Sequence, residues 1–135
     1  MSIGNMRKIL ICVLGLSWVH CQAQNEIQAG TIQFSANVID YGTIEKDSDP
    51  FREVTITNTG NYPLIINSCR ATCGCTVPNC PVEAIPPKKK SVIKVRYNTS
   101  NIGAFNKTIT VYSNDQNNPV TLIRIHGEVK ASTNR

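Results

Sequence analysis

Cysteine is the residue type in this sequence whose number and spacing could do chemistry. Four of the six cysteines fall within the stretch "CRATCGCTVPNC", as Cys69, Cys73, Cys75 and Cys80. The intervals between them are three, one and four residues. Thiols placed in this way could form disulfides, exchange disulfides with a partner, or hold a soft metal ion. The stretch is therefore the first candidate for a functional site.

Metal binding and redox exchange are the reactive uses of these thiols. A zinc site of four thiolates favours cysteine pairs separated by two residues, and the stretch has no such pair. Cu(I) is softer and takes two or three thiolates, so Cys73 and Cys75 are the candidate copper ligands. The same Cys-Gly-Cys pair could open and close as a redox dithiol. We keep Cu(I) or redox chemistry as the alternative reading, and predict no cofactor.

The sequence favours structural disulfides over these reactive uses. An even, clustered set of cysteines in an exported chain is typical of a disulfide framework. A bridge between Cys73 and Cys75 would close a tight ring, so it is the least favoured pairing. Bridges 69–73 with 75–80, or 69–75 with 73–80, remain, and the sequence leaves that choice open. Each such short loop would contribute about 2 kcal/mol to stability.

After residue 23 the sequence shows no recognisable set of residues for hydrolytic catalysis. The remaining histidine, His126, has the outward parity of the last predicted strand, beside Arg124 and Glu128. A nucleophile would need that imidazole within hydrogen-bond reach, and nothing in the sequence indicates it. Asp47 and Asp49 lie in a turn-like stretch where carboxylates are ordinary. We therefore predict that the protein is not an enzyme and has no catalytic residues.

The N-terminus predicts export. Arg7 and Lys8 precede the apolar run Ile9–Val19, and small and polar residues follow, which is the order of a secretory signal peptide. The run has 11 residues, whereas a membrane-spanning helix needs about 20, so we predict no transmembrane segment. Cleavage after Ala23 would remove residues 1–23 and leave Gln24 first.

Lipidation is the alternative interpretation of this N-terminus. Cys21 could be the acylated residue of an outer-membrane lipoprotein, but His20 stands where such signals carry a small residue. We favour simple cleavage and a location in the periplasm or outside the cell. The mature chain would keep 12 basic and 9 acidic residues. The basic run Lys88–Lys90 follows two prolines and has no interleaved aromatics, so no nucleic-acid partner is predicted.

The elements that must position the cysteines are predicted to be β-strands. Short alternating segments separated by Gly, Pro, Asn and Asp indicate an all-β, immunoglobulin-like β-sandwich of about seven strands over residues 31–130. "TIQFSANVIDYG" is taken as the first strand, "PLIINSC" suits a sheet centre, and a short strand is expected near Val82–Ile85. Residues 24–30 and 131–135 are expected to be loose ends. The inter-sheet core is predicted to contain Val54, Ile56, Ile93, Val95, Ile109 and Val111.

Several of these segments resemble one bacterial family. "YGTI", "TITNTGNYPLIINSCRATCGCTVP", "FNKTITVYSN" and "IHGEV" together are similar to the DUF1573 domain, frequent in Bacteroidetes and related in fold to ASH, Hydin and PapD-like sandwiches. The resemblance covers about residues 31–130. It implies that Cys73 and Cys75 are the family's cysteine pair, and that Cys69 and Cys80 are additions. The family has no established activity, so the resemblance implies fold and compartment only.

Together these observations predict an exported interaction module of the cell envelope. An immunoglobulin-like sandwich with a disulfide-stapled loop can bind a protein partner through a loop end or a sheet edge. The sequence does not identify that partner. The alternative is a periplasmic thiol redox or Cu(I)-handling protein that uses the Cys-Gly-Cys motif.

Overall fold

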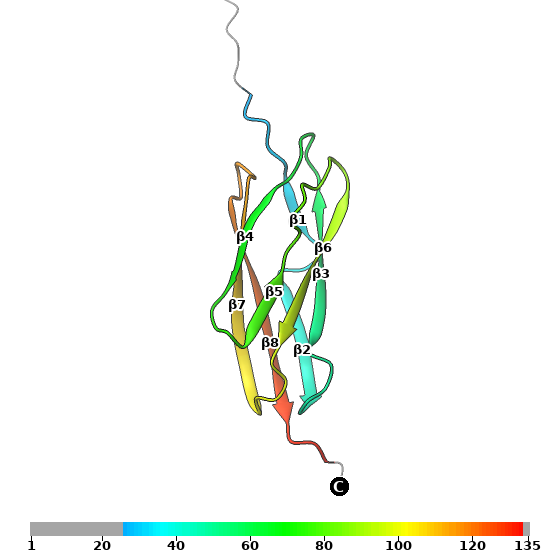
Figure 1. The fold of residues 1–135 in the computed structure, drawn as a ribbon, viewed down its shortest axis with the longest axis vertical. Coiled ribbons are helices and arrows are strands. Elements are labelled where there is room, and N and C mark those ends of the chain that lie inside the picture. Colours follow the sequence, from blue (N-terminus) through cyan, green and yellow to red (C-terminus); the bar gives the residue numbers. More distant parts are fainter. Residues whose placement is uncertain (1–25, 134–135) are drawn as a thin grey trace, which may run out of the picture.

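The protein folds as a sandwich of two four-stranded sheets (Figure 1). The structure is a computed structural model, and it describes residues 26–133. Sheet I has the strand order β1-β3-β6-β5, and sheet II has the order β2-β8-β7-β4. The strands are β1 (Ile32–Phe34), β2 (Val38–Glu45), β3 (Phe51–Asn58), β4 (Ile66–Ala71), β5 (Thr76–Asn79), β6 (Lys90–Tyr97), β7 (Gly103–Ser113) and β8 (Val120–Lys130). The predicted all-β, immunoglobulin-like class is confirmed.

The first predicted strand is in fact two strands, which lie in different sheets. β1 pairs antiparallel with β3 in sheet I, and β2 pairs parallel with β8 in sheet II. The chain crosses between the sheets at Ser35–Asn37, where the Ser35 N–H donates to the Thr55 carbonyl at 2.9 Å. At the other end of the crossing, the Arg124 N–H donates to the Asn37 carbonyl at 2.9 Å.

Two further strand predictions are wrong. β4 begins within "PLIINSC", but β4 is an edge strand of sheet II and not a central one. The stretch Val82–Ile85 forms a single bridge, in which Leu64 and Ile85 exchange backbone hydrogen bonds of 2.9 and 2.8 Å. That bridge uses the start of the "PLIINSC" segment, before β4 begins.

The predicted core is confirmed. The side chains of Val54, Ile56, Ile93, Val95, Ile109 and Val111 are all at most 2% exposed. They lie between the two sheets because alternate residues of a strand point to opposite faces. Lys94, between Ile93 and Val95 on β6, is exposed, as that alternation requires.

Three aromatic rings fill one part of the core. Tyr97 and Phe105 stack with ring centroids 3.7 Å apart, and Tyr41 meets Phe105 edge-on at 5.5 Å. The Tyr41 hydroxyl donates to the Pro50 carbonyl at 2.9 Å. Gly127 lies beside these rings, and an added Cβ would approach Tyr41 Cβ to 2.8 Å. The glycine of "IHGEV" therefore makes room for the aromatic cluster.

Two buried polar side chains hold the loops at one end of the sandwich. Asn58 is fully buried, donates to the carbonyls of Tyr62 and Ile85 at 2.7 and 2.9 Å, and accepts from the Gly60 N–H at 3.0 Å. Asp115 is 1% exposed and accepts from the backbone N–H of Ile32 at 2.8 Å. Because buried polar groups are costly unless they are paired, each side chain fixes the loops that surround it.

The predicted signal peptide, residues 1–23, and the predicted start at Gln24 lie outside the described residues. Within residues 26–133, no helix is long and apolar enough to span a membrane. Residues 26–30 precede β1 without regular structure, and residues 131–133 follow β8 in the same way.

Candidate functional site

The cysteine loop connects the two sheets. β4 is an edge strand of sheet II and β5 is an edge strand of sheet I, so the chain changes sheets between Ala71 and Thr76. In Figure 1 the loop between β4 and β5 lies along the left side of the sandwich. The four cysteines lie on or near this loop because their stretch makes the crossing.

The disulfide pairings differ from both predicted arrangements. Cys69 is bonded to Cys80, with Cα atoms 6.4 Å apart, and Cys73 is bonded to Cys75, with Cα atoms 5.4 Å apart. The preference against a Cys73–Cys75 bridge is therefore wrong. The prediction considered only ring size, whereas the tertiary structure places Cys69 on β4 beside the end of β5. That placement pairs Cys69 with Cys80 and leaves the two inner cysteines to each other.

The Cys69–Cys80 bridge, here called the outer bridge, joins the edges of the two sheets. Cys69 lies within β4, and Cys80 directly follows β5. Both residues are half-buried and pack against the hydrophobic core. A cross-link between elements 11 residues apart in sequence constrains the unfolded chain, and the packing of the sulfurs adds apolar burial. Its position is that of a structural staple.

The Cys73–Cys75 bridge, here called the inner bridge, lies within the turn itself. Both residues are half-buried, but only Cys75 packs against the hydrophobic core. The Cys75 Sγ lies 3.9 Å from the Thr76 Oγ1. An added Cβ at Gly74 would meet no atom within 4 Å, so solvent reaches the turn between the two cysteines.

Metal binding at these cysteines would require a different oxidation state. In the disulfide state neither Cys73 nor Cys75 offers the thiolate that Cu(I) needs. Across residues 26–133, no three His, Cys, Asp or Glu side chains gather in a way that could hold a metal ion.

His126 lies beside a carboxylate, not beside a nucleophile. Its Nδ1 lies 3.5 Å from Asp40 Oδ1, and both side chains are partly exposed on sheet II. The two residues are neighbours in the parallel β2–β8 register. This is a surface ion pair when the imidazole is protonated, and such pairs contribute little to stability.

A second candidate site covers the outer surface of sheet II. Four apolar side chains are exposed there: Val38 (48%), Tyr112 (37%), Val120 (50%) and Leu122 (57%). The strand register aligns them with two arginines, since Val38 is paired with Arg124, and Leu122 and Arg70 are both paired with Thr110. We call these six residues the sheet II patch.

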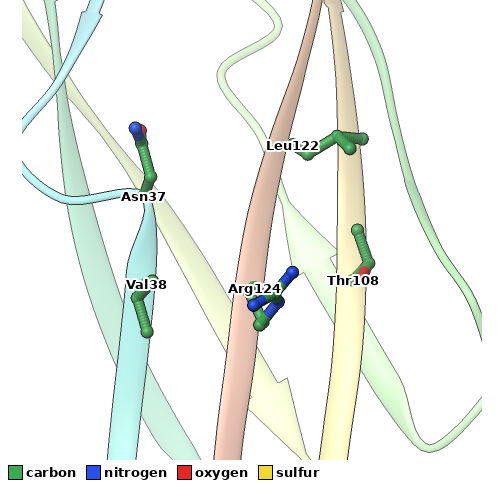
Figure 2. Close-up of a pocket in the computed structure, with 5 residues that line it drawn as sticks. All are labelled: Asn37, Val38, Thr108, Leu122 and Arg124. Carbon is green, nitrogen blue, oxygen red and sulfur yellow. The ribbon is translucent and has the colours of Figure 1, made fainter.

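A shallow pocket of about 270 Å³ lies at the β2 side of the patch. Figure 2 shows Arg124 between Val38 on β2 and Thr108 on β7, with Leu122 further along β8. Asn37 completes the lining where the chain enters β2. The patch and its pocket contain no acidic residue. Asp40 lies two residues beyond Val38 on β2, where it is paired with His126.

Sequence reasoning missed the sheet II patch. The signal was present in "VTLIRI", where Val120 and Leu122 have the opposite parity to the core residues Ile123 and Ile125. Apolar residues on both parities indicate a strand that buries one face in the core and offers the other to a partner.

The free sheet edges are each poorly suited to adding another strand. β1 has three residues, and Asp115 accepts the N–H of Ile32. β2 has an irregularity between Asp40 and Thr43, and β5 has four residues that include Pro78. The outer bridge lies along the edge of β4. Short strands, bulges and prolines are the devices that protect sheet edges, so the sheet II patch is a better binding surface than these edges.

Comparisons with known proteins identify a family and a fold. The model of the family described as "Protein of unknown function (DUF1573)" matches residues 32–129. A comparison with curated proteins found no match.

Solved structures show the same sandwich. A protein of unknown function from Porphyromonas gingivalis W83 superposes with a TM-score of 0.65 at 17% identity, over 76% of this chain and 48% of that chain. The ASH/PapD-like domain 7 of human CEP192 gives 0.63 at 8% identity, over 75% and 86%. The CsuC–CsuE chaperone–tip adhesion subunit pre-assembly complex of Acinetobacter baumannii gives 0.54 at 14% identity, over 74% and 57%. At these identities the likeness shows the fold.

Proposed function

Because this chain belongs to the DUF1573 family, whose description assigns no function, we propose from its surface that it is a non-catalytic protein-binding module. It acts after export, in the periplasm or outside the cell, and docks a protein partner on the sheet II patch. The cysteine loop holds the two sheets together along one side. The exposed apolar side chains of Tyr112, Val120 and Leu122, which lie on the paired strands β7 and β8, are the observation that carries this proposal.

The partner is a protein with an apolar surface and acidic groups around it. Val38, Val120 and Leu122 offer apolar area, and aromatic and arginine side chains such as Tyr112 and Arg124 are enriched in protein interfaces. The arginines of the patch have no acidic neighbour within it, so a partner's carboxylates would complement them. The PapD-like fold supports this reading by analogy, because one solved relative is a chaperone in complex with a subunit.

Export is supported by the oxidised cysteines. Two disulfides are typical of proteins in oxidising compartments and rare in the cytosol. The N-terminal sequence supplies the corresponding signal, with cleavage after Ala23 favoured over lipidation at Cys21.

Site-specific photo-crosslinking in the intact cell envelope tests the binding surface. A photoreactive residue at Val120 should give one discrete product with a different protein. The same residue at Val92, which is 43% exposed on the outer surface of sheet I, is the matched control and should give none. Arg124→Glu should abolish the product, and Arg124→Lys should preserve much of it, because the charge is retained.

Two outcomes would contradict this proposal. A product of twice the chain's own mass would mean that a second copy covers the patch. Equal products at Val120 and Val92, unaffected by Arg124→Glu, would mean that the patch has no specific partner.

A further inference from the structure

The inner bridge joins no two elements of the fold. The outer bridge already connects β4 to the end of β5 and encloses the whole turn. The inner bridge spans a single residue, Gly74, inside that enclosed turn. A structural role for the inner bridge would therefore duplicate what the outer bridge achieves.

Backbone hydrogen bonds hold the turn independently of the inner sulfur atoms. The Thr72 N–H donates to the Thr108 carbonyl at 3.1 Å, which ties the turn to β7. The Asn98 N–H donates to the Cys75 carbonyl at 2.8 Å, which ties it to the end of β6. The Thr76 N–H also donates to the Cys73 carbonyl at 3.3 Å. None of these hydrogen bonds uses a sulfur atom, so opening the inner bridge breaks none of them directly.

The turn is open to a partner. The φ of Gly74 is not in the left-handed region, and a Cβ at this position would meet nothing within 4 Å. Neither the backbone conformation nor the packing of this chain therefore requires glycine. A residue without a side chain does, however, leave the disulfide uncovered on the solvent side, where a second protein can approach it.

The two sulfurs of the inner bridge have different surroundings. Cys75 packs against the hydrophobic core, whereas Cys73 does not. The Thr76 hydroxyl, 3.9 Å from Cys75 Sγ, is placed to donate a hydrogen bond to a thiolate on Cys75. Hydrogen bonding to a thiolate makes it a better leaving group. Apolar packing disfavours a thiolate on Cys75, and the Thr76 hydroxyl offsets that cost. The arrangement favours attack at Cys73, which lacks this packing, and departure of Cys75.

We propose that the inner bridge is a reversible thiol–disulfide exchange site, with Cys73 as the attacked sulfur and Cys75 as the leaving group. The co-reactant is a dithiol, either on a partner protein or supplied as dithiothreitol. This activity is chemically separate from docking on the sheet II patch. It takes place in the turn that follows β4, which is the edge strand of sheet II opposite β2.

Reduction of the inner bridge by the dithiol takes place in two steps. A thiolate of the dithiol attacks Cys73 Sγ, a mixed disulfide forms, the Cys73–Cys75 bond breaks, and Cys75 leaves as a thiolate. The second thiolate of the dithiol then attacks the dithiol sulfur that is bonded to Cys73. A disulfide forms within the dithiol, and Cys73 leaves as a thiolate. The dithiol is oxidised by two electrons, the inner bridge is reduced by two electrons, and the two protons move to Cys73 and Cys75.

Stepwise reduction of the purified exported chain tests the proposal. The chain is equilibrated with rising dithiothreitol, alkylated and mapped by mass spectrometry. We expect Cys73 and Cys75 to be labelled at a dithiothreitol concentration at least about tenfold below that which labels Cys69 and Cys80. The cooperative unfolding transition should persist in the selectively reduced protein. Simultaneous labelling of the four cysteines, or labelling of the inner pair only in denaturant, would overturn the proposal.

Trapping and one set of variants test the assigned roles. When the oxidised chain reacts with reduced glutathione and is then quenched by alkylation, glutathione should be found on Cys73 and the alkyl label on Cys75. Thr76→Val should slow reduction of the inner bridge severalfold, Thr76→Ser should restore the rate, and Thr55→Val on β3 is the matched control without effect. Equal rates for Thr76→Val and the unaltered chain, or glutathione found on Cys75, would overturn the assignment of Cys75 as leaving group.

Discussion

Cys69 on β4 and Cys80 at the end of β5 join the edges of two different sheets, with their Cα atoms 6.4 Å apart. The cross-link lies where the chain passes from sheet II to sheet I. It therefore restrains the two layers of the sandwich against each other at that point, and its contribution to stability should differ from that of the inner bridge.

Loss of the outer bridge should be costly, and loss of the inner bridge should not. Replacing Cys69 and Cys80 together by alanine should lower the free energy of unfolding by about 3 kcal/mol, because the closed loop is long enough to restrict the unfolded chain. Replacing Cys73 and Cys75 together by serine should cost less than about 1.5 kcal/mol, because a loop of this size removes little entropy. Urea unfolding without reductant measures both, and equal losses would contradict this division of roles.

The strand register predicts which side chains of β6 and β7 matter. Ile109→Ala should cost about 2–5 kcal/mol, because it leaves a cavity between the sheets. Lys94→Ala, on the exposed face of β6, should change stability by less than about 0.5 kcal/mol. Thermal or urea unfolding provides the comparison. A loss at Lys94 as large as the loss at Ile109 would show that the register is wrong by one residue.

The buried polar side chains should be as important as parts of the apolar core. Asn58→Ala would leave the Tyr62 and Ile85 carbonyls and the Gly60 N–H without their partner. We expect a loss of about 1–3 kcal/mol or more, because unpaired buried groups retain their full desolvation cost. Asn61→Ala, at an exposed position three residues later, is the matched control and should be close to neutral. Similar small effects at both positions would contradict the proposed anchoring role.

Alkaline conditions should destabilise the fold through its buried tyrosines. Burial raises the pKa of Tyr97 above its ordinary value of 10.0, and burial, opposed by the nearby Arg52, also raises the pKa of Tyr41. A raised pKa means that the folded state holds the proton more tightly than the unfolded chain. The corresponding stability is therefore fully present below about pH 10 and is lost as the pH rises through the folded-state pKa.

Tyr97→Phe isolates this effect. The variant retains the ring that stacks on Phe105 but cannot ionise. Its urea midpoint should fall less between about pH 9 and 11 than that of the unaltered chain. Tyr112→Phe, on the exposed side of β7, is the control that should behave like the unaltered chain. Parallel pH profiles for Tyr97→Phe and the unaltered chain would rule out Tyr97 as a source of the alkaline loss.

The mass of the exported protein should correspond to a chain that begins at Gln24. The small residues Cys21 and Ala23 satisfy the cleavage rule, whereas His20 does not fit a lipidation signal. Intact-mass measurement of the protein recovered from the cell envelope gives the answer directly. A chain that begins at Cys21 and carries acyl groups would show instead that the module is attached to a membrane.

Local sequence patterning was enough to predict the class of fold, the faces of several strands and six residues of the core. Alternation between apolar and polar residues is a local property, since side chains two positions apart share a face. For this reason Val54 and Ile56 on β3, and Ile109 and Val111 on β7, could be assigned to the core without knowledge of any strand partner. The Asn58 anchor also had a local signal, because asparagine before Thr-Gly commonly bonds to the backbone two residues on.

The pairing of the strands and of the cysteines depends on long-range contacts, which local patterning does not reveal. The segment from Ile32 to Glu45 divides between two sheets, and β4 lies at an edge, because these outcomes depend on partners distant in sequence. The same long-range placement brings Cys69 to Cys80 and leaves Cys73 to Cys75, against the preference derived from ring size. Local spacing measures the cost of closing a ring, whereas the fold determines which sulfur atoms meet.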